Sequence, residues 1–405
     1  MAFTREDEQF MLEALRLAGN GRGAVEPNPM VGAILVRDGK VIGRGFHRAY
    51  GEAHAEVECL RDARSKGEDV RGATMYVTLE PCSHRGKTPP CANRLVEEEL
   101  KRVVIATEDP LWAHHAGSDG KGESPRGLEL LREAGIETEV GLCRDRARML
   151  NAAFMKRSAR NMPLVIAKWA MSADGKIATH TGSSRWISCE QSRARVHKLR
   201  GMVDGVMVGS GTALRDDPRL TCRMALPRRH PSRIVLCGES VPRPDSALFR
   251  TLSEGEVILV HIEHAPPEHL EPLVDAGCEA VGVPADENDG GRVDVRAVLQ
   301  RMGERGMSNV LVEGGSEVFG SLFDAGLVDR VMIFVASGVV GGAGAVTAVG
   351  GDGVKTMGRW TALLGDVTTG DRRKPPAEPV TRVELCGRDI LINGWTTDPR
   401  VWGNK

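Results

Sequence analysis

Three potential metal ligands and one carboxylate are spaced along the chain so that they could act together. His54 is followed by Ala55 and Glu56, and Cys82 and Cys91 come downstream, each directly after a proline. One imidazole and two thiolates can fill three tetrahedral positions of Zn²⁺, and the metal lowers the pKa of a water in the fourth from about 15.7 towards 7. Glu56 could take the proton of that water and return it to a ring nitrogen and a departing amine. The sequence therefore predicts one zinc ion per chain, with Glu56 as the catalytic acid and base of a deaminase.

A closed structural zinc site, with a fourth protein ligand in place of water, is the alternative. The segment between Cys82 and Cys91 is longer than in the usual P-C-x-x-C pattern of deaminases, so the spacing alone does not decide between the two. A closed site would leave Glu56 without a purpose, and we therefore favour the open, catalytic site.

Apolar periodicity around these residues predicts alternating helices and strands. An amphipathic helix over residues 6–18 precedes a hairpin that turns at Asp38-Gly39-Lys40. Further strands are expected over residues 73–79, 102–106 and 137–140, and further helices from His54 and over residues 92–99 and 123–135. This alternation predicts an α/β layer sandwich, with the ligands near helix starts, where thiolates are favoured.

A second α/β pattern begins at Leu164. Predicted strands over residues 205–209 and 309–313 run into Ser210-Gly211-Thr212 and Gly314-Gly315-Ser316, where backbone N–H groups could hold a phosphate, although each junction could also be an ordinary turn. Neither is a Rossmann fingerprint, because Leu214 stands where that motif needs glycine. We predict a first domain over residues 1–148, a linker helix over residues 149–162 and a second domain over residues 163–405.

Composition narrows the class of protein. A length of 405 residues suits two or three domains, and a net charge of −1 with 4% aromatic residues gives no basis for a nucleic-acid or membrane partner. Residues 331–351 lack charge but are rich in glycine, so we expect a buried strand and a loop there. The acidic start without an apolar signal core, and nine cysteines without a paired framework, predict a cytoplasmic protein.

Longer strings in both halves match one known family. The first half carries Pro27-Asn28-Pro29-Met30-Val31-Gly32, His54-Ala55-Glu56 and Pro81-Cys82-Ser83-His84-Arg85-Gly86-Lys87-Thr88-Pro89-Pro90-Cys91. The second carries Lys168-x-Ala170-x-Ser172-x-Asp174-Gly175, Ser184-x-Trp186-Ile187-Ser188, His197-x-x-Arg200, Gly209-x-Gly211-Thr212, Asp216-Asp217-Pro218-x-Leu220-Thr221-x-Arg223 and Glu313-Gly314-Gly315. Over residues 6–330 the chain resembles the bifunctional deaminase/reductase family of riboflavin biosynthesis; after Ala336 the resemblance weakens. It implies a cytidine-deaminase-like three-layer α/β sandwich followed by a dihydrofolate-reductase-like α/β domain.

The resemblance also implies roles for individual residues. The residues expected to border NADPH are Ala170, Trp186, Thr212, Asp216 and the stretch from Gly315 through Ser316 to Ser321. Those expected to border the reductase substrate are Ser184, Arg200, Leu220, Arg223 and Glu313. Asn28, held between two prolines, would present its amide to the deaminase substrate. His84 is expected to approach the pyrimidine rather than zinc, because three zinc ligands are already assigned.

Some of these residues have alternatives. Arg200 and Arg223 suit a ribose 5′-phosphate because guanidinium groups offer paired donors, but Arg200 could be a solvated helix charge. Trp186 could be a core residue. Lys168 and Glu313 are candidates for positioning or protonating the sugar during hydride transfer, although another Lys, an Asp or water could serve.

The resulting hypothesis is one chain that performs two consecutive steps. It would deaminate 2,5-diamino-6-ribosylamino-4(3H)-pyrimidinone 5′-phosphate, with zinc, and then reduce the ribosyl group of the product to ribityl, with NADPH. A homo-oligomer, dimer or tetramer, formed through the reductase half is expected from the resemblance. The alternatives are a nucleic-acid adenosine or cytidine deaminase, which leaves the second half unexplained, and a regulatory protein with one degenerate domain.

Overall fold

The computed structural model divides the chain into two compact units. It describes residues 3–83, 89–111, 125–224, 227–238, 240–264, 270–286, 291–368 and 380–402. Among these, the first unit contains residues 3–160 and 399–402, and the second contains residues 161–368 and 380–398. In the described part of the chain, no helix is long and apolar enough to cross a membrane.

A five-stranded sheet in the order β2-β1-β3-β4-β5 forms the centre of the first unit. The antiparallel pair β1 and β2 is the predicted hairpin, and β3, β4 and β5 run parallel to one another. The strand bounds are β1 Gly32–Arg37, β2 Lys40–Phe46, β3 Thr74–Val77, β4 Arg102–Ile105 and β5 Glu137–Val140.

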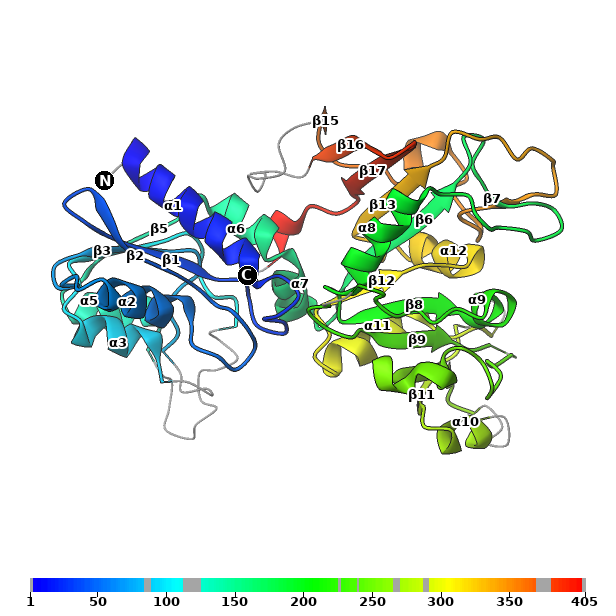
Figure 1. Cartoon of the computed structure of the whole chain (residues 1–405), viewed down its shortest axis with the longest axis horizontal. Helices are drawn as coiled ribbons and strands as arrows, with labels where there is room; N and C mark the ends of the chain where they lie inside the picture. The colour runs from blue at the N-terminus through cyan, green and yellow to red at the C-terminus, as the bar shows by residue number, and fades with distance from the viewer. Residues whose placement is uncertain are drawn as a thin grey trace. The chain divides into compact units, whose positions relative to one another are not determined.

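Helices cover both faces of this sheet, which gives three layers (Figure 1). Successive side chains of a strand point to opposite faces of the sheet. Ile34 packs with Met11 and Leu15 of α1 on one face. Leu35 packs with Leu60 of α2 and Leu95 of α3 on the other face. The helix bounds are α1 Arg5–Ala18, α2 Ala55–Ser65, α3 Cys91–Glu97, α5 Gly127–Glu133, α6 Arg144–Leu150 and α7 Ala152–Arg160, with a 3₁₀ turn η1 Gly19–Gly21. The predicted layer sandwich is confirmed.

The linker helix predicted over residues 149–162 is not continuous, because α6 ends at Leu150 and α7 begins at Ala152, with Asn151 between them. The side chain of Asn151 accepts a hydrogen bond from Met30 N at 2.8 Å and donates one to Met30 O at 2.9 Å. A tertiary contact therefore ends the helix where the local sequence would have continued it.

The end of the described chain packs on the first unit. Arg148 Nη1 donates to Arg400 O at 3.0 Å, and Trp402, in the residues that follow the 3₁₀ turn η5 Pro399–Val401, is 2% exposed. The compact units thus differ from the predicted boundaries at this end, since residues 163–405 had been assigned to one domain.

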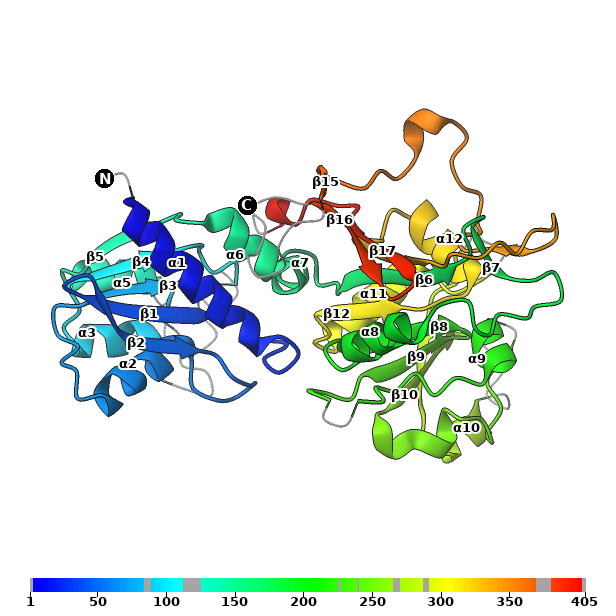
Figure 2. The ribbon, with the colours of Figure 1, turned by 45° about the horizontal axis from the view of Figure 1, so that its top comes forward.

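A ten-stranded sheet forms the second unit, in the order β11-β10-β9-β8-β12-β6-β13-β17-β16-β15. The seven strands from β11 to β13 are parallel, and part of this order can be followed in Figure 2. Its strand bounds are β6 Leu164–Met171, β8 Gly205–Gly209, β9 Ser232–Leu236, β10 Val257–Ile262, β11 Glu279–Val283, β12 Asn309–Val312, β13 Arg330–Val335, β15 Val367–Thr368, β16 Thr381–Cys386 and β17 Asp389–Trp395. A separate pair joins β7 Lys176–Ala178 to β14 Val346–Thr347.

Helices and short turns fill in the second unit. Val165, Ala167 and Trp169 of β6 face a core that includes Phe319 of α12, so Lys168 and Ala170 point to the opposite face. The bounds are α8 Glu190–Arg200, α9 Ser210–Asp216, α10 Glu271–Asp275, α11 Val295–Glu304 and α12 Ser316–Asp324, with 3₁₀ turns η2 Phe249–Glu254 and η4 Met357–Arg359. Residues 331–351 form all of β13 after Arg330, then an irregular segment that includes β14, as expected for a strand and loop.

Candidate active sites

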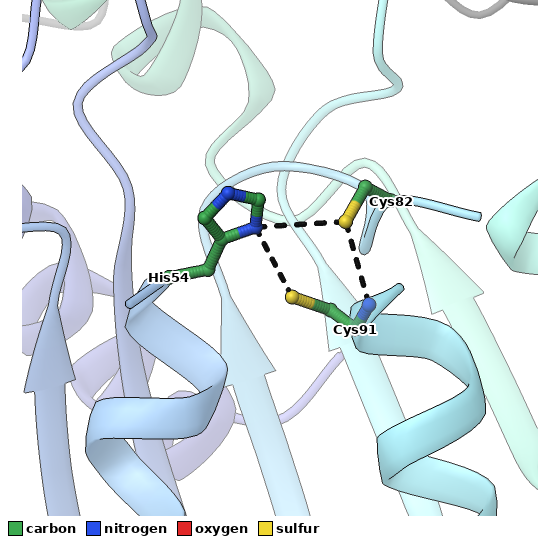
Figure 3. A group of neighbouring side chains, drawn as sticks. All are labelled: His54, Cys82 and Cys91. Atoms are coloured by element: carbon green, nitrogen blue, oxygen red, sulfur yellow. Dashed lines mark hydrogen bonds between the residues drawn. The ribbon is translucent and has the colours of Figure 1, made fainter. Parts of the chain in front are cut away.

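The three predicted zinc ligands meet in the first unit (Figure 3). The His54 Nδ1 atom lies 3.2 Å from Cys91 Sγ and 3.5 Å from Cys82 Sγ, and the three donor atoms all lie within 4.8 Å of one another. The hydrogen bond to Cys82 raises the pKa of His54 to about 9, and Cys91 and His54 hold the pKa of the Cys82 thiol well below its usual range. The three donor atoms converge on one point, which is the place that Zn²⁺ would take.

Local structure explains how residues from distant elements converge here. His54 is the residue before α2, Cys91 is the first residue of α3, and Cys82 follows β3 with its sulfur accepting a hydrogen bond from Cys91 N at 3.4 Å. Gly45 of β2 lets α2 approach the sheet, because a Cβ atom there would lie 2.3 Å from Ala55 O. Among the described residues the cluster consists of three donors, a set that fits an open zinc site.

Glu56 lies next to the ligand cluster. Its side chain is 4% exposed and is hydrogen-bonded to the Cys91 thiol. Burial raises the pKa of the Glu56 carboxyl to about 7, against the opposing charge of His54. A carboxyl group that exchanges its proton near neutral pH is suited to accept and return a proton in each turnover.

Asn28 reaches the neighbourhood of the cluster through His47. Asn28 Nδ2 lies 3.2 Å from His47 Nε2, while His47 Nδ1 lies 3.1 Å from Ala53 O. The rings of His47 and His54 are 5.5 Å apart, so the predicted substrate amide stands near the zinc ligands. His84, the other predicted substrate contact, lies outside the described residues.

The second unit contains a cavity of about 950 Å³ at the carboxyl ends of β6, β8 and β12. Ligands bind at such ends in open α/β sheets. Both glycine junctions open onto the cavity, and a Cβ atom on Gly315 would lie 3.0 Å from Thr212 Oγ1. The two junctions therefore form one backbone-lined wall that a nucleotide could approach closely.

A buried charge cluster lies in this cavity. Arg200 donates to Glu313 from Nε at 2.5 Å and from Nη2 at 2.9 Å, and Lys168 Nζ lies 3.8 Å from Glu313 Oε2. Burial alone would raise the pKa of Glu313, but the charges of Arg200 and Lys168 lower it to about 2. Burial lowers the pKa of Lys168, against the attraction of Glu313.

Nearly all residues predicted for cofactor and substrate in this half line the cavity. They are Lys168, Ala170, Ser184, Trp186, Arg200, Thr212, Asp216, Leu220, Arg223, Glu313, Gly315 and Ser316. Ser321 is not among the lining residues; it lies further along α12, where its hydroxyl donates to Glu317 O at 3.2 Å.

Two of these residues have surroundings that their sequence did not indicate. Arg200 is not a solvated helix charge, because it is 12% exposed and donates to Glu313 from two nitrogens. Trp186 is 65% exposed and lies under the guanidinium of Arg193 at 4.5 Å, so it is not a core residue.

The sequence analysis did not identify most of the positively charged side chains that line the cavity of the second unit. Arg193, which joins His197 and Arg200 on α8, has the i, i+4, i+7 spacing of one helical face, and this spacing was the available signal. Four further arginines, Arg185, Arg215, Arg219 and Arg250, also line the cavity and suit a phosphorylated substrate and a phosphorylated dinucleotide.

These two sites define a class of protein: a zinc-dependent deaminase unit joined to a nucleotide-dependent α/β reductase unit. Comparisons with known proteins specify the family. Residues 4–107 match the cytidine and deoxycytidylate deaminase zinc-binding region, and residues 163–369 match the RibD C-terminal domain. The chain belongs to the RibD family.

Relatives of the whole chain agree. The riboflavin biosynthesis protein RibD of Aquifex aeolicus is 38% identical over 335 residues, 83% of this chain and 88% of that protein. The Escherichia coli RibD is 34% identical over 348 residues, 83% of this chain and 89% of that protein. The crystal structure of a Thermotoga maritima deaminase/reductase matches with a TM-score of 0.73 and 34% identity, over 96% of this chain and 98% of that one.

The protein is therefore a bifunctional deaminase and reductase of riboflavin biosynthesis that uses Zn²⁺ and NADPH. The cytidine-deaminase-like and reductase folds expected from the sequence are confirmed. The alternatives of a nucleic-acid deaminase and of a regulatory protein do not account for a reductase domain beside a complete set of zinc ligands.

Proposed function

We propose that the first unit removes the 2-amino group of 2,5-diamino-6-ribosylamino-4(3H)-pyrimidinone 5′-phosphate, and that the second reduces the ribosyl group of the product. The Thermotoga structure is named for a diaminohydroxyphosphoribosylaminopyrimidine deaminase and a 5-amino-6-(5-phosphoribosylamino)uracil reductase. The observation that carries the proposal for this chain is Glu56, buried and hydrogen-bonded beside the cluster of His54, Cys82 and Cys91.

In the first unit, His54, Cys82 and Cys91 would hold Zn²⁺, which when bound activates water for attack on the ring. Glu56 takes up a proton on its carboxylate and returns it to the ring nitrogen and to the leaving amine. Asn28, oriented by His47, offers its amide to the pyrimidine. The Glu56 carboxyl, itself 4% exposed, keeps its proton away from bulk water.

In the second unit, NADPH supplies the hydride, and the backbone wall of Gly315, Ser316 and Thr212 borders the cofactor. Glu313 is ionised at neutral pH because its pKa is about 2, so it cannot donate a proton to the sugar. Lys168, held 3.8 Å from Glu313, is the acid, and Glu313 positions it. Arg200 acts through Glu313, and Arg223 is left as the predicted arginine for the 5′-phosphate.

A homo-oligomer that forms through the second unit is part of the proposal. Met357, Trp360 and Leu385 of that unit are 73%, 62% and 79% exposed, so an interface could cover apolar side chains there. Light scattering on the purified chain tests it, with a monomer mass of 43.7 kDa as the contrary result. A cytoplasmic location is proposed on the nine free cysteines, none of which is paired in the structure.

The test is one reaction tube that contains the purified protein, the diaminopyrimidine ribotide and NADPH. Ammonia release and the loss of NADPH absorbance are followed together, beside a sample treated with a zinc chelator and one given the deaminated ribotide. We expect both ammonia release and NADPH loss. Chelation should abolish ammonia release but leave NADPH loss on the deaminated ribotide unchanged. Ammonia without NADPH loss would contradict the proposal for the second unit.

A further inference from the structure

His197 contacts the arginine that we assign to the substrate phosphate. His197 lies on α8, lines the cavity and is half-buried. Arg223 reaches it from the loop after α9, with Arg223 Nε 3.1 Å from His197 Nε2. The same loop is fixed to α8 a second time, since Cys222 Sγ donates to His197 O at 3.1 Å.

Arg223 approaches both ring nitrogens of His197. Its backbone N lies 3.5 Å from Nδ1 and its side-chain Nε lies 3.1 Å from Nε2, whereas a neutral imidazole has a free lone pair on only one nitrogen. The shorter contact is the one to Nε2, which we therefore take as the acceptor of the Arg223 side chain.

The surrounding charges keep this ring neutral. Burial and the cations Arg200 and Arg223 lower the pKa of His197 to about 4, against the attraction of Glu313. A neutral acceptor can fix a guanidinium without cancelling its positive charge, whereas a carboxylate in the same place would form an ion pair. Arg200 shows the contrast, because its charge is met by Glu313.

We propose that His197 is a positioning residue for phosphate binding: its unprotonated Nε2 holds the Nε edge of Arg223, so that the two terminal nitrogens remain free and charged for the 5′-phosphate. This rests on the proposed role of Arg223. No substrate, cofactor or reacting atom needs to touch His197 itself.

The experiment measures reductase KM and kcat for the deaminated ribotide and for its dephosphorylated riboside. His197→Ala is expected to raise the KM of the ribotide about three- to tenfold, with kcat little changed, because one hydrogen bond to Arg223 is lost. The KM of the riboside should stay within about twofold. An equal rise for both substrates would show a merely structural role and overturn the proposal.

Two isosteric variants separate the ring nitrogens, and they serve even where the alanine variant folds poorly. In His197→Gln the side-chain oxygen can reach the position of Nε2, so the ribotide KM should return to within about twofold of the native value. In His197→Asn the shorter side chain reaches only the position of Nδ1, and the KM should stay raised. Equal KM values for these two variants would overturn the proposal. His230→Gln, at an exposed histidine outside the cavity, is the matched control.

Arg223→Ala, alone and combined with His197→Ala, separates this inference from the function on which it rests. The single variant should raise the ribotide KM about tenfold or more, and adding His197→Ala should raise it little further, because both act through one contact. An unchanged KM in Arg223→Ala would remove Arg223 from the phosphate site. If Arg223→Ala raises the ribotide KM but His197→Ala leaves it at the native value, only the positioning role of His197 is refuted.

Discussion

The two active sites of this chain are built in opposite ways. The chemistry of the deaminase site is assigned to three donor atoms within 4.8 Å of one another and one carboxyl group, all supplied by residues 54–91. The reductase site is a cavity of about 950 Å³ whose lining extends from Lys168 to Val346. A metal ion concentrates the charge needed for deamination at one point, so few residues carry that chemistry, whereas the reductase must bind a dinucleotide as well as its ribotide.

The sites also differ in how they manage charge. The zinc cluster gathers thiols and an imidazole that need a cation, while the reductase cavity pairs its own buried ions, Arg200, Lys168 and Glu313. Substitutions in the zinc cluster should therefore reduce deaminase activity more than stability. Substitutions in the buried ion cluster of the reductase cavity should reduce both activity and stability. Four predictions test this difference.

The largest effect is expected from Glu56→Gln. Amide nitrogen cannot carry the proton between water and the leaving group, so ammonia release should fall about 10²- to 10⁴-fold. NADPH oxidation with the deaminated ribotide should be unchanged. Stopped-time ammonia assays and absorbance at the NADPH band measure the two activities, and loss of both would show that the units are not independent.

Glu313→Gln should lower both the stability of the second unit and its reductase activity. The change leaves Arg200 and Lys168 without their buried partner, which should lower the free energy of unfolding by about 3 kcal/mol. The matched control is Glu279→Gln, since Glu279 is 46% exposed and pairs with Arg305; it should cost less than about 1 kcal/mol. Urea unfolding followed by tryptophan fluorescence measures both, and equal losses would contradict the comparison.

The stability lost in Glu313→Gln should depend on pH. The folded-state pKa of Glu313 is about 2, below its ordinary value of 4.5, so its stabilising contribution is fully present above pH 4.5 and is lost as the pH falls towards 2. The difference in unfolding free energy between native protein and variant should therefore be constant near neutral pH and shrink through this window. A difference that grows with acid would have the wrong sign.

Asn151→Ala should have the smallest effect and should affect only the deaminase. It removes both hydrogen bonds to Met30, two residues from Asn28, and should lower the unfolding free energy of the first unit by about 1–3 kcal/mol. The loop that carries Asn28 is then less well held, and deaminase KM should rise about threefold. Reductase KM should not change; a parallel rise in both would mean that α6 and α7 influence the two sites alike.

Much of the fold could be predicted from the sequence, because the patterns that indicate these helices and strands are local. The hairpin turn at Asp38 and Gly39, the apolar runs of β6, β8 and β12, and the helix after His54 all formed close to their expected bounds. The break at Asn151 and the packing of Trp402 could not be predicted, because each depends on a partner far away in the sequence.

By itself, the sequence determined the candidate zinc ligands His54, Cys82 and Cys91 and the candidate proton carrier Glu56, because this chemistry requires particular side-chain types in a particular order. It also determined the family and both activities, since its strings are specific to them. Only the tertiary structure decided that Arg200 pairs with Glu313 and that His197 contacts Arg223. A guanidinium can donate to a phosphate, a carboxylate or an imidazole, and the fold selects which of these acceptors lies within its reach.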